Sequence, residues 1–74
     1  MIVVNQDKTF ITETKDLWRD GKAIYCNNYT ANEFNLTLAT YNNEDDSSYV
    51  FEELLKHFMS EEPYYLPQKD KVRN

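Results

Sequence analysis

Residues 34–59 read FNLTLATYNNEDDSSYVFEELLKHFM, and this stretch holds both the clearest strand pattern and the clearest helix pattern of the chain. In its first part, the large apolar residues Phe34, Leu36 and Leu38 alternate with polar or small residues. A period of two places these three side chains on one face of a strand, as in a sheet that is covered on one side. We therefore expect all three to point into the core.

The second part of the stretch predicts an amphipathic helix from about Glu44 to about Met59. Asn43 can accept hydrogen bonds from the first-turn N–H groups, and the acidic residues that follow it face the positive end of the helix dipole. An apolar stripe then recurs at spacings of three and four: Ser47, Val50, Phe51, Leu54, Leu55 and Phe58. Asp45, Glu52 and Lys56 fall on the opposite face, with Glu52 and Lys56 at the i, i+4 spacing that favours an ion pair.

Upstream of this stretch, residues 2–4 and 9–12 are separated by polar turn-forming residues and predict a short N-terminal hairpin. Residues 22–27 predict another strand, because they contain the run Ala-Ile-Tyr-Cys. The intervening segment, 13–21, is polar apart from Leu17 and Trp18, so we expect a loop that ends in a turn at Asp20-Gly21.

Downstream of the helix, Tyr64-Tyr65-Leu66 lies between two prolines. This segment predicts either a short edge strand or an extended segment laid over the core. The whole order indicates an α+β domain, in which a small antiparallel sheet of three to four strands packs on one C-terminal helix. We expect one domain over residues 1–67, followed by a polar, flexible tail over residues 68–74.

The predicted core is small and consists of Phe34, Leu36, Val50, Leu54 and Phe58, together with the N-terminal Val and Ile residues. A chain of 74 residues buries only about 60% of the surface of its extended form, so its stability is marginal unless a partner adds to it. The sequence therefore leaves open a homodimer.

Charge is unevenly distributed along the chain, whose formal net charge is −5. Residues 1–32 are balanced, residues 33–62 carry eight acidic residues and one lysine, and residues 63–74 carry one acidic residue and three basic ones. Nucleic-acid binding needs a cationic surface, so we do not expect the folded part to bind nucleic acid directly. The acidic surface serves either solubility or the docking of a basic partner.

The residues that could carry chemistry do not form a recognisable site. Cys26 and His57 are the conventional nucleophile and base, but nothing in their spacing brings them together, and we expect a buried thiol and a surface imidazole. Acidic residues in the first turn of a helix project in different directions, which argues against a metal site. Gly21 is the only glycine, so no phosphate-cradling loop is present. We therefore expect a non-enzymatic protein without a cofactor or a metal.

Aromatic residues are the better candidates for function. The chain contains six Tyr, four Phe and one Trp, and Trp, Tyr and Arg are enriched at interface hot spots. The alternative is that these aromatics are bulky core residues with their polar tips in water. The candidate interaction surface consists of Trp18, Asp45, Glu52, Tyr64 and Tyr65.

Three stretches resemble a group of short uncharacterised proteins encoded by phages, prophages and conjugative elements of Gram-positive bacteria. They are MIVVNQDKT at 1–9, LATYNNED at 38–45 with Val50 and Glu53-Leu54 beyond it, and YYLP at 64–67. The group has a V-Q-D-K start, a helix entry of the form L-G-x-Y-x-T-E-E-x-A, and an aromatic-Met-Pro near its end. The chain departs from that pattern at four positions: Ala39, Asn43, Ser47 and Leu66. The resemblance implies a mobile-element origin and no particular activity.

These observations favour a small acidic interaction protein of a phage or mobile element, which binds and thereby inhibits or occupies a host or phage protein. The alternative is a small single-stranded nucleic-acid accessory protein that uses its basic tail and sheet aromatics. No apolar run approaches the ~18 residues of a membrane span, and no secretory signal pattern is present. We therefore expect a protein of the bacterial host cytoplasm that is not bound to a membrane.

Overall fold

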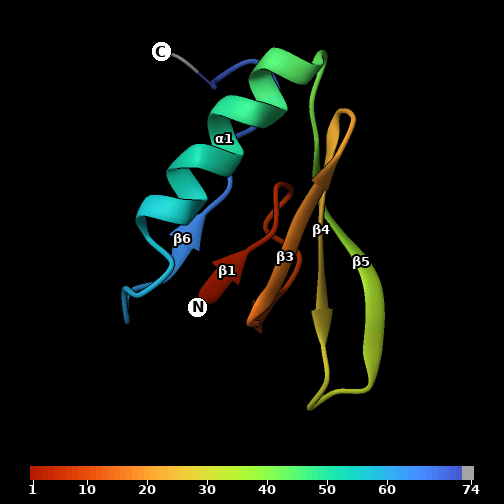
Figure 1. Ribbon diagram of the computed structural model, residues 1–74, viewed down its shortest axis with the longest axis vertical. Coiled ribbons are helices and arrows are strands. Elements are labelled where there is room, and N and C mark those ends of the chain that lie inside the picture. Colours follow the sequence, from red (N-terminus) through yellow and green to blue (C-terminus); the bar gives the residue numbers. More distant parts are fainter. Residues whose placement is uncertain (73–74) are drawn as a thin grey trace.

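The computed structural model describes residues 1–72, and Arg73 and Asn74 lie outside the described residues. Over residues 1–72 the chain forms one helix and two three-stranded sheets (Figure 1). The first sheet has the order β2-β1-β6 and the second the order β3-β4-β5. The predicted α+β class is confirmed, and the strands are divided between two sheets rather than gathered in one. The elements are β1 (Ile2–Val4), β2 (Ile11–Glu13), β3 (Asp16–Asp20), β4 (Ala23–Asn28), β5 (Glu33–Thr40), α1 (Glu44–Lys56) and β6 (Tyr64–Tyr65).

The first sheet joins the two ends of the chain. β1 pairs antiparallel with β2 through the predicted hairpin and parallel with β6, where Val3 lies opposite Tyr64. The Asn5 side chain closes the hairpin turn, since its Oδ1 accepts from the N–H groups of Thr9 at 2.9 Å and Phe10 at 3.0 Å. Of the two arrangements expected for Tyr64-Tyr65, the structure contains the edge strand.

The second sheet is a meander that includes a strand where we expected a loop. Residues 16–20 form β3, which pairs with β4 so that Leu17 lies opposite Cys26 and Trp18 opposite Tyr25. The expectation of a loop was wrong. β3 is an edge strand, and edge strands often carry charged residues, so its composition resembles that of a loop. The turn after Asp20 was predicted correctly, and Gly21 adopts φ +59° there, a conformation that glycine accepts without strain.

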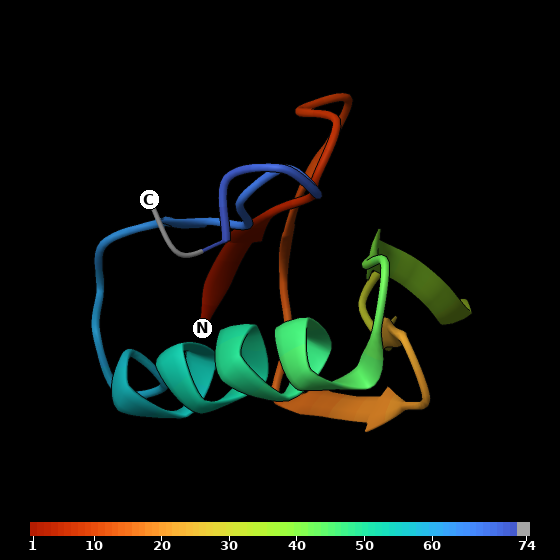
Figure 2. The same cartoon turned by 90° about the horizontal axis from the view of Figure 1, so that it is seen from above.

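The core lies between α1 and the two sheets (Figure 2), and its buried residues come from β1, β4, β5, α1 and the segments that follow β5 and β6. Val50 and Leu54 of α1 are buried as predicted, whereas Leu36 and Phe58 are only half-buried. The residues that form the core cluster are Val3, Ile24, Cys26, Leu38, Ala39, Tyr41, Val50, Leu54 and Leu66.

Phe34 is 51% exposed, so its predicted place in the core is wrong. Between two paired positions, Cys26 with Leu36 and Asn28 with Glu33, β5 contains one more residue than β4. Asn35 in that segment has a left-handed φ of 56°. This bulge breaks the two-residue period on which the prediction rested, and Phe34 turns outward.

The helix begins as predicted and ends slightly earlier. Asn43 Oδ1 accepts from the N–H of Asp46 at 2.8 Å, which confirms the cap. At the other end, the His57 N–H donates to Leu54 O at 3.0 Å, and tight turns follow instead of the expected continuation to Met59. The apolar stripe is also narrower than predicted, because Leu55 is 55% exposed.

Residues 68–72 form a turn in which the Lys71 N–H donates to Gln68 O at 3.0 Å. Val72 packs against the core cluster. Flexibility of the segment 68–74 stays a prediction, and its last two residues are outside the described part of the chain. In residues 1–72, the helix is too short and too polar to cross a membrane.

Candidate interaction surface

The outward side of α1, together with the turn after it, combines acidic and apolar side chains. We call it the helix surface: Asp45, Tyr49, Glu52, Leu55 and Met59. Asp45 and Glu52 are seven residues apart, about two turns, so they lie on one line along the helix, and both are exposed as expected. The exposed fraction is 41% for Tyr49, 55% for Leu55 and 89% for Met59. Exposed apolar side chains that lie together mark protein-binding surfaces, so we take this side of the helix as the candidate surface.

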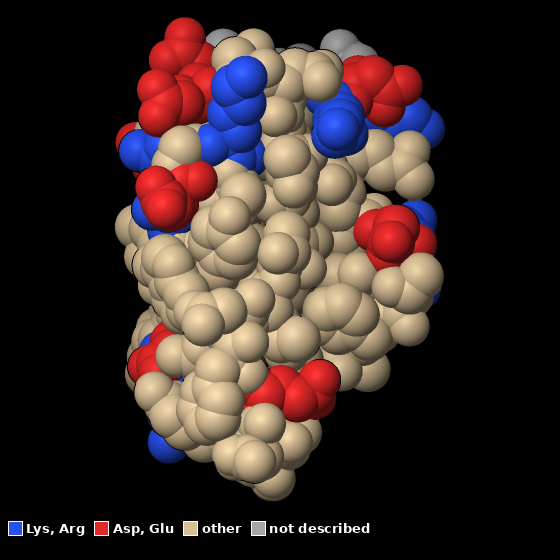
Figure 3. All heavy atoms as spheres, turned by 90° about the vertical axis from the view of Figure 1, so that its right-hand side faces the viewer, with Lys and Arg blue, Asp and Glu red and all other residues tan. Residues whose placement is uncertain are grey.

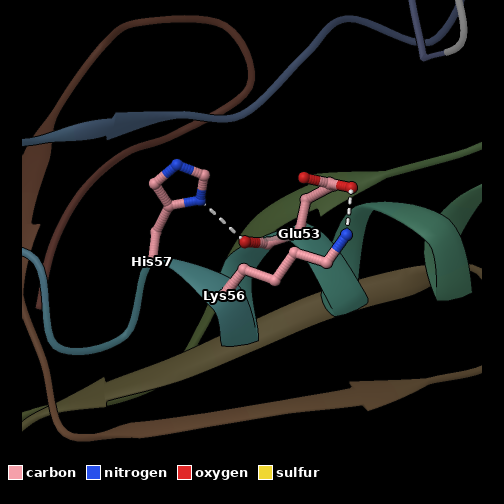
Figure 4. A network of polar contacts seen from close by, with 3 residues as sticks. All are labelled: Glu53, Lys56 and His57. Carbon is pink, nitrogen blue, oxygen red and sulfur yellow. Dashed lines mark hydrogen bonds and ion pairs between the residues drawn. The ribbon is translucent and has the colours of Figure 1, made fainter.

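The helix is strongly acidic, with five acidic residues and one lysine between Glu44 and Lys56. Lys56 does not pair with Glu52 as predicted, because its Nζ lies 3.2 Å from Glu53 Oε1, one residue further along (Figure 4). An exposed pair of this kind stabilises the fold by only about 0–1 kcal/mol. The pair matters more for the charge of the helix surface, because the single lysine of the helix lies beside Glu53 and not beside Glu52.

A hollow of about 580 Å³ lies beside the C-terminal end of the helix surface, between the turn after α1 and the first hairpin. We call it the Met59 groove. Its lining is mostly apolar, with two acidic residues and one lysine at its edges: Met1, Ile2, Glu13, Lys15, Phe58, Met59, Ser60 and Glu61. Hollows of this size accommodate one or more large side chains or a small ligand. Met59 belongs to both the helix surface and the groove, so the two are continuous.

Tyr64 and Tyr65 do not form one patch, because successive residues of a strand point to opposite faces. Tyr64 is half-buried and packs against His57 of the helix end, with ring centroids 5.0 Å apart. Burial raises its pKa, and the nearby Glu53 carboxylate adds to this effect. The His57 Nδ1 lies 2.9 Å from Glu53 O (Figure 4). Tyr64 therefore joins β6 to α1, whereas Tyr65 is 60% exposed.

Trp18 belongs to β3 and not to a loop. Its ring stacks on Tyr25 of β4 at 5.8 Å with an interplanar angle of 24°, and it is half-buried. Because alternate residues of a strand share a face, Asp16 and Asp20 lie on the same side of β3 as Trp18. Of the five candidate residues, only Asp45 and Glu52 share one face of one element.

The two residues considered for catalysis lie in different surroundings. Cys26 is fully buried, and burial, followed by the charge of Glu33, raises the pKa of its thiol to about 11. It is therefore a protonated core residue at neutral pH, while His57 is exposed at the helix end. In the part of the chain that the structure describes, no group of three or more His, Cys, Asp or Glu residues is arranged to hold a metal ion.

Sequence reasoning missed Tyr49, Leu55 and Met59. Leu55 was predicted to belong to the apolar stripe, and Met59 was predicted to end the helix. Its position in the turn after α1 leaves it 89% exposed. Tyr49 lies four residues after Asp45 and three before Glu52, spacings that place all three on one side of a helix, and this spacing was the available signal.

No family model matches the chain, and no match appears among curated proteins or solved structures. The similarity to proteins of phages and conjugative elements therefore stays a prediction from the sequence.

Proposed function

We propose that this chain is a small acidic interaction protein that binds a basic protein partner through the helix surface. In this proposal the partner is a protein of the bacterial host or of the phage or mobile element that encodes the chain, and binding acts by occupying the partner's surface. The observation that carries the proposal is the combination of acidic Asp45 and Glu52 on α1 with exposed Tyr49 and Leu55 on the same helix and Met59 in the turn after it.

The two kinds of side chain have separate roles in such an interface. Large apolar side chains that become fully desolvated supply most of the binding free energy. Acidic side chains at the rim select a partner of opposite charge and speed its association. The Met59 groove, with Glu13 and Glu61 at its edge, provides a place for an apolar side chain of the partner next to a basic one.

The aromatic residues of the second sheet favour a protein partner over a single-stranded nucleic acid. A single strand binds where aromatic rings lie within a positively charged groove. Trp18 instead lies between Asp16 and Asp20 on the same face of β3, and these carboxylates repel phosphate. Arg19, the basic residue of that strand, donates to Gly21 O at 2.9 Å.

The proposal is tested by capturing host proteins on three immobilised forms of the chain: the wild type, the double variant Asp45→Lys/Glu52→Lys, and a control double variant Asp20→Lys/Glu33→Lys. Both double variants change the net charge equally, but the control residues lie in the second sheet. A specific partner should be retained by the wild type and the control and lost from the helix variant. Equal retention on all three forms contradicts the proposal.

The kinetics of a purified partner give a second readout. If the helix surface steers association, the on-rate for the wild type should fall as salt rises, and the helix variant should associate more slowly at low salt. Met59→Ala should act mainly on the off-rate, since it removes an apolar contact and no charge. An on-rate that is independent of both salt and the helix charges would refute the role of the acidic residues.

A further inference from the structure

The second sheet has an outer face that points away from α1. Leu17 of β3 packs against the core cluster, and successive residues of a strand point to opposite faces, so Trp18 points outward. Tyr25 lies directly opposite Trp18 in the pairing of β3 with β4 and therefore shares this face. We call the set of Asp16, Trp18, Asp20 and Tyr25 the outer sheet face.

The indole ring of Trp18 has one covered side and one open side. Tyr25 stacks on it with ring centroids 5.8 Å apart and an interplanar angle of 24°. β3 is the edge strand of its sheet, so no strand of this sheet lies on the side of Trp18 that is opposite Tyr25. The faces of an indole ring carry negative electrostatic potential and attract cations such as a guanidinium group. The open side of Trp18 is therefore suited to a cation.

Two carboxylates flank Trp18 along β3. Asp16 and Asp20 lie two residues to either side of it on the same face, about 6.6 Å away along the strand. Asp16 Oδ2 accepts from Asn27 Nδ2 at 3.4 Å, and Asp16 also bonds the Tyr29 hydroxyl, so its carboxylate is held in position. Asp20 is exposed, and its carboxylate has no bonding partner among residues 1–72.

The basic residues near β3 lie outside the outer sheet face. Figure 3 views the molecule from the side opposite α1. Uncharged side chains cover the middle of this side, and charged side chains of both signs gather toward its upper end, where β3 turns into β4. Arg19 points to the other face of β3 and donates to Gly21 O at 2.9 Å. Lys22 lies in the turn itself, and Lys15 lines the Met59 groove. The outer sheet face along β3 is therefore acidic.

We propose that the outer sheet face binds an extended protein segment that has arginine at alternate positions, Arg-x-Arg. A guanidinium group is planar, so it can stack on the open side of Trp18 and pair with the Asp20 carboxylate beside it. Alternate side chains of an extended segment are also about 6.6 Å apart. The second arginine then reaches Asp16 while the first occupies Trp18.

This site is independent of the proposed function, because the helix surface lies on the other side of the second sheet. A partner that is held by α1 does not contact Asp20, so the control variant Asp20→Lys/Glu33→Lys still captures it. A protein that binds through the outer sheet face shows the opposite pattern: it is lost from that control and retained by Asp45→Lys/Glu52→Lys. The two proposals can therefore fail separately.

The test uses the fluorescence of Trp18, which is the only tryptophan of the chain and so reports on this site. The full chain is titrated with the capped peptide Ala-Arg-Ala-Arg-Ala, which should change the emission saturably. The same peptide with citrulline in place of both arginines is neutral and should give no change. Ala-Arg-Arg-Ala-Ala carries the same charge, but its adjacent side chains point to opposite faces, so it should bind more weakly. No saturable change with the first peptide, or equal binding of any two of the three, overturns the proposal.

A matched pair of variants locates the binding. Asp20→Asn should weaken binding of Ala-Arg-Ala-Arg-Ala about twofold to fivefold, the effect of losing one exposed charged contact. Asp45→Asn removes the same charge from α1 and should leave the dissociation constant unchanged. Both residues are exposed, so both variants should keep the circular dichroism of the wild type. Equal weakening by the two variants, or peptide-induced shifts of backbone N–H NMR signals that are confined to α1, would refute the outer sheet face as the binding site.

Discussion

The burial of α1 is tested most directly by two adjacent leucines. Leu54 is 0% exposed and belongs to the core cluster, whereas Leu55 is 55% exposed. The change Leu54→Ala removes buried apolar atoms and leaves a cavity, at a cost of about 2–5 kcal/mol. A domain of this size has a free energy of unfolding of about 4–11 kcal/mol, taking the usual range per residue. This single change therefore removes a large part of the total stability.

The control is Leu55→Ala, which makes the same chemical change one residue away and should cost less than about 1 kcal/mol at so exposed a position. The assay is urea unfolding of both variants followed by circular dichroism at the helix wavelength, with the slope of the transition compared to that of the wild type. Equal losses of unfolding free energy for the two variants, or a loss below about 0.5 kcal/mol for Leu54→Ala, would refute the orientation of the helix, in which Leu54 faces the core and Leu55 the solvent.

Two further predictions concern buried polar and titratable groups. The Ser47 hydroxyl is buried and lies 2.7 Å from Gly21 O, so Ser47→Ala should lower the free energy of unfolding by about 0.5–1.5 kcal/mol. The loss should fall toward the lower value because Arg19 also donates to Gly21 O, and Ser48→Ala is the control in the same thermal unfolding assay; an equal effect of both would contradict the contact. The Cys26 thiol has a pKa raised from 9.0 to about 11, so the folded state favours the protonated form. Its contribution to stability is complete below pH 9 and is lost as the pH rises toward 11. Iodoacetamide should label Cys26 in urea and not in the native protein, and rapid native labelling at pH 8 would show that the thiol is accessible.

The parts of this fold that could be predicted from the sequence are those that depend on near neighbours along the chain. Asn43 caps the helix through a hydrogen bond to a residue three positions away, and the dipole and the apolar stripe act over one or two turns. The turn at Asp20-Gly21 likewise depends on the left-handed conformation of a single glycine. Asp45 and Glu52 could be placed on the outward face because helical spacing alone determines it.

Tertiary structure decided the features that depend on distant residues. β3 exists because Leu17 and Trp18 pair with Cys26 and Tyr25, and its polar composition conceals that pairing. Phe34 lies outside the core because β5 contains an extra residue opposite β4. Asn35 adopts the left-handed conformation at this bulge.

The candidate interaction surface also depends on contacts between remote segments. β6 pairs with β1 across nearly the whole chain, and the turn after α1 leaves Met59 beside Met1 and Ile2 in one groove. Pairing register and the approach of remote segments depend on the packing free energy of the whole domain, which no local pattern contains.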